Sequence, residues 1–161
     1  MSDTPVLPAT DCHAAASRPQ WMTLLAETPP AEIERHWKVL PRPTFTWIRR
    51  PELGSAMVRG RASGTGAQFN LGDVTVTRCT LQLSTGEIGV SYVMGRNKRH
   101  AALSALFDAM LQREKSTGET IVCGAIAAMM ELRDRRRRQI LDDTRSSKVD
   151  FTMLSPGGAE Q

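Results

Sequence analysis

Residues 58–79 read VRGRASGTGAQFNLGDVTVTRC and join two strand-like runs through a loop that is rich in glycine. Glycine accepts a positive φ and lets the backbone come close to a ligand or to a neighbouring chain. Arg59, Arg61 and Arg78 flank this loop, and guanidinium groups beside exposed backbone N–H groups suit an anion. The spacing fits neither common phosphate-binding loop, because a strand-like run follows where a helix would be needed. The stretch therefore predicts two strands and a loop suited to an anion.

The size and composition predict one soluble domain. The chain has 161 residues, of which 40% are hydrophobic and 24% charged, and a net charge of +4. Apolar runs stay well short of the roughly 20 residues that cross a bilayer, and the first residues do not resemble a secretory signal. The three cysteines form neither a C-x-x-C pair nor a zinc spacing. We therefore expect a cytoplasmic protein that binds no metal and no membrane.

Two parts of the chain are predicted to be helical. A short N-terminal helix with Trp21 on its apolar side is followed, after Thr28-Pro29-Pro30, by a second helix that Pro41 ends. Near the C-terminus an apolar stripe starts after Asn97, a fair N-cap, and breaks at residues 117–118. A longer helix is expected at about residues 120–143.

The middle of the chain is predicted to be β-structure, with strands at 44–50, 55–61, 73–83 and 88–94. The sequence thus predicts an α+β fold, with an antiparallel sheet of about four strands, an N-terminal helical pair and two C-terminal helices. We expect a disordered arm at 1–18, one domain at 19–154 and a disordered tail at 155–161. Residues 149–154 read as a short strand or a docking tail.

Two cationic segments lie in the C-terminal half. Arg96 and Lys98 surround the predicted start of a helix, where the helix dipole disfavours cations, so they mark either an anion or partner site or a solvated turn. His100 follows as a weak candidate for acid–base chemistry. The run 133–138 holds five arginines with acids at i,i+4, which favours an ion-paired face. Binding to an acidic partner and binding to nucleic acid are the alternatives, and we expect no nucleic acid.

Several motifs together resemble those of the PhnG family. They cover about residues 18–153 in the expected order, and the run from Arg59 to Arg78 is the most distinctive. The matching segments are Arg18-x-x-Trp21-Met22, Met57-Val58-Arg59-x-Arg61, Gly64-Thr65-Gly66-x-x-Phe69-Asn70-x-Gly72-Asp73-x-Thr75-x-Thr77-Arg78, Tyr92-Val93-x-Gly95-Arg96-x-Lys98-x-His100-Ala101 and Val149-Asp150-Phe151.

The resemblance implies a subunit of the carbon–phosphorus lyase core complex, which breaks down organic phosphonates with PhnI, PhnH and PhnJ family partners. The complex makes α-D-ribose 1-methylphosphonate 5-triphosphate from ATP and methylphosphonate and releases adenine. This chain itself would bind no cofactor. The chemistry of that step is usually credited to the PhnI partner, which agrees with the lack of a catalytic constellation here.

Two hypotheses about this subunit remain open at the level of sequence. In the first, it contributes to the synthase reaction, with anion, nucleotide or partner contacts from the loop and the cationic segments. The candidate residues are Arg59, Arg61, Gly64, Thr65, Gly66, Arg78, Arg96 and Lys98, with His100 as a weak catalytic candidate. In the second, it is a scaffold module that touches no substrate.

Overall fold

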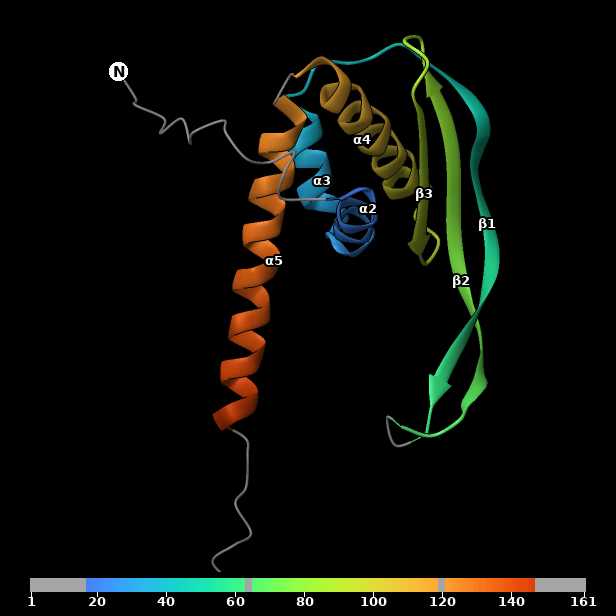
Figure 1. Ribbon diagram of the computed structural model, residues 1–161, viewed down its shortest axis with the longest axis vertical. Coiled ribbons are helices and arrows are strands. Elements are labelled where there is room, and N and C mark those ends of the chain that lie inside the picture. The colour runs from blue at the N-terminus through green and yellow to red at the C-terminus, as the bar shows by residue number, and fades with distance from the viewer. Residues whose placement is uncertain (1–16, 63–64, 119–120, 147–161) are drawn as a thin grey trace, which may run out of the picture.

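The computed structural model describes residues 17–62, 65–118 and 121–146 (Figure 1). The expectations for residues 1–16 and 147–161, including the strand or tail at 149–154, lie outside these ranges. The described elements are α2 (Arg18–Glu27), α3 (Pro30–Trp37), β1 (Phe45–Arg61), β2 (Gln68–Leu83), β3 (Ile88–Met94), α4 (Lys98–Thr117) and α5 (Ile121–Ser146). They confirm the α+β class, the N-terminal helical pair and the two C-terminal helices.

The sheet has three antiparallel strands in the described residues, in the order β1-β2-β3, rather than about four. The predicted strands at 44–50 and 55–61 are one strand, because Pro51 does not end it. The pairing with β2 shifts register between Trp47 and Arg49 and again between Arg49 and Glu52, and then continues to Arg61. A proline is tolerated at such an irregularity in an edge strand, since it removes no essential ladder hydrogen bond.

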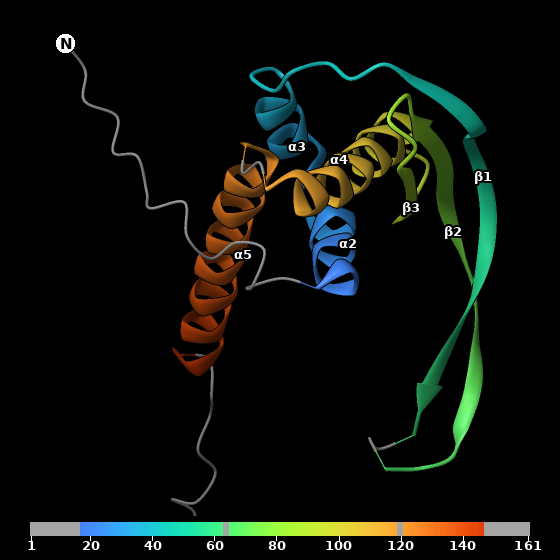
Figure 2. The ribbon, with the colours of Figure 1, turned by 45° about the horizontal axis from the view of Figure 1, so that its top comes forward.

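Helix α4 lies at the centre of the fold, between the sheet and the other helices (Figure 2). Asn97 caps its first turn, because its side-chain oxygen accepts a hydrogen bond from the backbone N–H of His100 at 2.9 Å. Gly118 ends the helix with φ of 77°, the left-handed conformation that glycine adopts without strain. The helix is buried along most of its length, with Leu103 and Phe107 almost inaccessible.

A buried carboxylate joins α4 to α2 and β3. Asp108 accepts hydrogen bonds from the Arg18 guanidinium, from the indole Nε1–H of Trp21 at 2.9 Å and from the backbone N–H of Val90 at 2.9 Å. The Arg18 contacts raise the pKa of that guanidinium, chiefly through the hydrogen bond to Asp108. Arg18 and Trp21, which carried part of the family resemblance, therefore hold the helical layer to the sheet.

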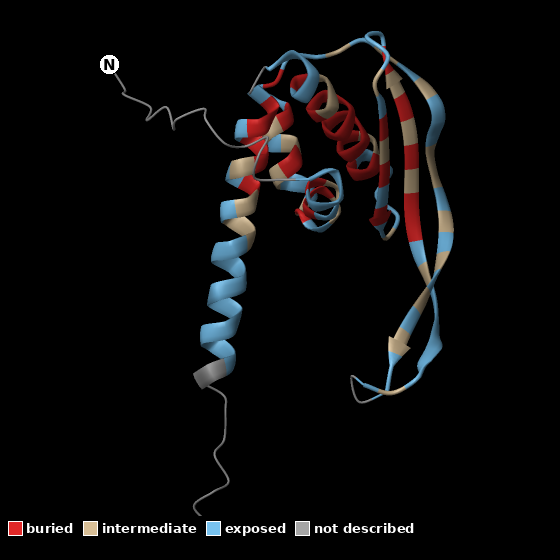
Figure 3. Ribbon diagram, viewed as in Figure 1, coloured by how far each residue is buried: buried red, intermediate tan, exposed pale blue. Residues whose placement is uncertain are grey.

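The start of α5 is fixed by a second buried carboxylate. Glu114 on α4 accepts hydrogen bonds from the backbone N–H groups of Val122 at 2.6 Å and Cys123 at 3.0 Å. Free N–H groups at a helix start attract a negative charge, so this contact sets where α5 begins. Only the first half of α5 packs on the body, and its second half is exposed (Figure 3).

The inner face of β3 carries the small side chains. Gly89, Ser91 and Val93 face α4, and a methyl group at Gly89 would lie 1.9 Å from the carbonyl oxygen of Ala105. The close approach of α4 therefore requires glycine at this position. The more apolar set on the alternate positions, Ile88, Tyr92 and Met94, is 43%, 56% and 72% exposed.

Candidate functional site

The β1–β2 hairpin continues past the end of β3. The last pair between β2 and β3 is Val76 with Met94, whereas β1 and β2 stay paired as far as Arg61 with Gln68. Residues 55–61 and 68–75, here called the arm, therefore form a two-stranded ribbon that projects beyond the three-stranded sheet (Figures 1 and 3). A two-stranded ribbon is at best marginally stable by itself in water.

The arm exposes large apolar side chains. Met57, Phe69 and Leu71 are 60%, 47% and 62% exposed. Leu71 falls where the register shifts between Val58 and Arg59, and its side chain lies over Gly60, where an added Cβ would be 2.7 Å from it. Met57 lies on the same side of β1 as Arg59, whereas Gly60, and with it Phe69 and Leu71, lies on the other side, so the arm exposes apolar groups on both sides. Exposed apolar groups on a marginal element are typical of a surface that binds another protein.

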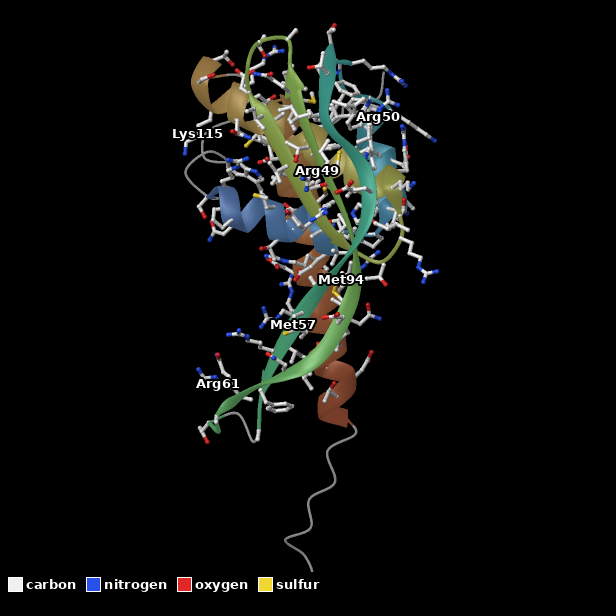
Figure 4. The ribbon with its side chains drawn as sticks, turned by 90° about the vertical axis from the view of Figure 1, so that its right-hand side faces the viewer. Arg49, Arg50, Met57, Arg61, Met94 and Lys115 are labelled. Atoms are coloured by element: carbon white, nitrogen blue, oxygen red, sulfur yellow. The ribbon has the colours of Figure 1, made fainter. Side chains whose placement is uncertain are left out.

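The outer face of the sheet continues the side of the arm that carries Phe69 and Leu71 (Figure 4). Tyr92 and Met94 of β3 lie beside Arg78 and Val76 of β2 through the strand pairing. Because the helices cover only the opposite face, Tyr92 and Met94 have no described layer over them, whereas Val76 is buried with 8% of its surface exposed. The arm and this outer face are therefore candidate contact surfaces of the described chain.

The three arginines around the glycine-rich loop do not converge. Arg59 and Arg61 are exposed near the tip of the arm, opposite Asn70 and Gln68. Arg78 lies eight positions along β2 from Asn70, roughly 25 Å away for an extended strand. Its Nε donates to Glu52 Oε1 at 2.8 Å, and Arg49 lies 3.6 Å from the same oxygen. Arg78 therefore belongs to an ion-pair cluster on the outer face.

The loop itself closes the arm. The backbone N–H of Gly66 donates to the carbonyl oxygen of Ala62 at 2.9 Å, and a Cβ at position 66 would lie 2.6 Å from that oxygen. Thr65 is exposed, while Gly64 lies outside the described residues. Gly66 is thus explained by the tight turn, whatever else the loop binds.

Arg96 and Lys98 lie at the base of the arm, not at its tip. The turn that holds them is attached to β2, because the N–H of Gly95 donates to the Thr75 carbonyl at 2.8 Å and the Thr77 hydroxyl donates to the Gly95 carbonyl at 2.7 Å. Both cations are exposed. The neighbouring cation of the segment, Arg99, pairs with Glu34 of α3 at 2.6 Å. The structure therefore separates the predicted cations into a tip pair, Arg59 and Arg61, and a group near the base.

His100 is buried, with 5% of its surface exposed. Its Nε2 lies 2.8 Å from the carbonyl oxygen of Leu25, and since a carbonyl only accepts, the ring donates from Nε2. Burial lowers the pKa of His100, and the hydrogen bond to Leu25 only partly offsets this effect. The structure thus places the ring in the interior between α4 and α2, whereas Arg96 and Lys98 are exposed.

Two features were missed from the sequence alone. Asp108 interrupts an otherwise apolar helical stripe, and such a lone acid is a usable signal for a buried ion pair. The second feature is a groove between α2 and α5, whose signal was the apolar periodicity that continues to Ile140 and Leu141.

None of the helices in the described residues is both long and apolar enough to cross a bilayer. Nor do three or more of the His, Cys, Asp and Glu side chains of these residues gather in a group that could hold a metal ion.

The fold and its surface define a small α+β protein in which helices cover one face of a three-stranded sheet and a two-stranded arm projects from it. The chain belongs to the PhnG family of phosphonate metabolism proteins, whose family model matches residues 16–157. It is similar to the alpha-D-ribose 1-methylphosphonate 5-triphosphate synthase subunit PhnG of Rhizobium meliloti (strain 1021), with 35% identity over 150 residues. That match covers 92% of this chain and 94% of the relative. The family membership expected from the motifs is confirmed.

Proposed function

We propose that this chain is a subunit of an α-D-ribose 1-methylphosphonate 5-triphosphate synthase and that its main role is to hold the complex together. Its partners are PhnI, PhnH and PhnJ family subunits, and the complex converts ATP and methylphosphonate with release of adenine. The observation that carries the proposal is the arm, a marginal two-stranded ribbon with exposed Met57, Phe69 and Leu71.

The arrangement of the predicted site residues supports an assembly role. The anion candidates that the structure describes are divided between the tip and the base of the arm, so they do not converge on one site. His100, the weak catalytic candidate, is buried against Leu25 and has a lowered pKa because of that burial. Catalytic groups from partner subunits fit this arrangement better than a catalytic group from this chain.

Co-expression of the four subunits tests the proposal. Met57→Glu places a charge in the exposed apolar surface of the arm, and we expect the complex to dissociate at concentrations at least tenfold higher than for the unchanged chain. Val39→Glu is the matched control, because Val39 is 81% exposed and lies outside the arm. Size-exclusion chromatography with light scattering reads out assembly. A Met57→Glu complex as stable as the control would overturn the proposal.

A second role for the tip is supported by one observation. Arg59 and Arg61 lie on the same side of β1 as Met57, since side chains two positions apart share a face. A partner that contacts Met57 therefore meets both guanidinium groups, which suit the triphosphate of a bound substrate. In this case Arg59→Ala with Arg61→Ala leaves the complex assembled but raises its KM for ATP about tenfold. An unchanged KM in an assembled complex would leave the tip with no substrate contact.

A further inference from the structure

A second surface without a covering element lies between α2 and α5, on the helical side of the molecule. It is a groove of about 560 Å³. Leu24 of α2 and Met129 of α5 are almost fully buried at its inner end. Farther along α5, Ile140 and Leu141 are 64% and 53% exposed. Figure 3 shows the change from buried to exposed along this helix.

One face of α5 lines the groove, and its side chains follow a helical repeat. The apolar positions are Met129, Leu132, Ile140 and Leu141, and the positions between them are Arg133, Arg136 and Arg137. Steps of three and four residues keep all of these on one side of a helix. This face, here called the seam, spans about 18 Å along the axis, or three turns and a third.

Helix α2 covers only the first part of the seam. It has ten residues, and the chain turns away at Thr28 and Pro29. The seam continues beyond it with an apolar pair that remains exposed. A second helix laid along the seam would bury this pair, because the spacing of the seam is the one that packed helices use.

The charges of the groove specify the partner. Glu27 is the one acidic side chain among the described residues that line it, against three arginines. Arg133 also donates to Asp134 at 3.1 Å, which leaves Arg136 and Arg137 as the main uncompensated cations of the seam. A covering helix with carboxylates opposite these arginines and apolar side chains opposite Ile140 and Leu141 would complement the groove.

We propose that the groove binds an acidic amphipathic helix of another subunit of the synthase complex. The inference rests on the proposed function for the existence of such a complex, but it uses a surface separate from the arm. A second copy of α5 is a poor occupant, because it would set arginine against arginine. Residues 149–154 of this chain are a poorer match as well, because VDFTML alternates every second position and carries one carboxylate.

Photocrosslinking in the assembled, full-length complex identifies what covers the seam. The probe is p-benzoylphenylalanine at position 140, with the same probe at position 138, on the opposite side of α5, as the control. We expect position 140 to capture a partner peptide that has helical apolar periodicity and at least two carboxylates, and position 138 not to capture it. Crosslinks to residues 147–161, to a second copy of this chain or to a segment without acids would overturn the inference.

Charge reversal tests the electrostatic part. Arg136→Glu with Arg137→Glu is expected to weaken assembly at least tenfold, whereas Arg135→Glu with Arg138→Glu makes the same charge change off the seam and leaves assembly unchanged. All four arginines are exposed, so circular dichroism should show both variants folded. Equal assembly of the two variants contradicts the inference. If Met57→Glu dissociates the complex while both charge-reversal variants assemble equally, the proposed function stands and only the inference about the groove fails.

Discussion

The guanidinium of Arg18 donates two parallel hydrogen bonds to the carboxylate of Asp108, although the two residues are 90 positions apart in the chain. Arg18 Nε lies 3.1 Å from Oδ1 and its terminal nitrogen lies 2.8 Å from Oδ2. The carboxylate is fully buried, while the arginine side chain is 42% exposed. This paired geometry adds direction to the attraction between the charges, so α2 is held at one angle against α4.

Asp108→Asn is expected to destabilise the protein by about 3 kcal/mol, because it removes the ion pair and places an amide NH₂ group among donors. Urea unfolding followed by circular dichroism measures the change. Asp134→Asn is the control, since its partner Arg133 is on the exposed part of α5 and such a pair contributes about 1 kcal/mol or less. An equal decrease in the free energy of unfolding for the two variants would mean that the buried Asp108 network contributes no more to stability than an exposed ion pair.

The stability of the protein should fall as the pH drops below about 6.5, the ordinary pKa of histidine. The folded state lowers the pKa of His100 through burial, so the unfolded chain takes up a proton first and is favoured as the pH falls. His100→Gln should make the free energy of unfolding less dependent on pH between 4.5 and 7. His36→Gln should reduce this pH dependence of the free energy of unfolding less, because the His36 ring is only half-buried. An unchanged slope for His100→Gln would contradict this assignment.

Gly89→Ala and Gly124→Ala should have opposite effects. A methyl group at Gly89 meets the Ala105 carbonyl at 1.9 Å and Ala109 Cβ at 2.9 Å, so α4 must move away from β3 at a cost of about 3 kcal/mol. Gly124 is an exposed position inside α5 with nothing within 4 Å of an added Cβ, and alanine there should stabilise the helix by about 0.8 kcal/mol. Thermal unfolding should show a lower melting temperature for Gly89→Ala and a higher one for Gly124→Ala. An unchanged melting temperature for Gly89→Ala would refute the close contact.

Cys79 should resist alkylation in the folded protein. It is 1% exposed, and burial raises the pKa of its thiol to about 11 from 9.0. The reactive thiolate is therefore about 100-fold scarcer than for an ordinary cysteine at pH 8. Iodoacetamide labelling with mass spectrometry of the Cys79 peptide should show modification only after unfolding in guanidinium. Rapid labelling of the native chain would instead place this thiol at the surface.

Helix ends were readily predicted because local residues set them. Asn97 and Gly118 act at the two ends of α4 through their own side-chain and backbone properties, and neither depends on the rest of the fold. Pro51 misled the prediction of the strands. Its local preference for a turn was overcome by β2, whose unbroken run of residues keeps β1 paired on both sides of the irregularity.

The candidate site was predictable only in part. Sequence proximity suggested that Arg59, Arg61 and Arg78 surround one loop, but extended strands carry neighbours apart at roughly 3.3 Å per residue. The sequence also did not show which side of β3 packs against the helices. The alternation along 88–94 puts Ile88, Tyr92 and Met94 on one face and Gly89 on the other without deciding which face packs inward, and the tight approach of α4 selects the face of Gly89.

This preference for small side chains beneath α4 has a consequence for the cell. The sheet exposes bulky apolar side chains to solvent. A copy of the chain made without partner subunits would therefore present an apolar surface that favours aggregation in the cell. How much of the protein stays in solution would then depend on how closely its synthesis matches that of the subunits that we propose to cover it.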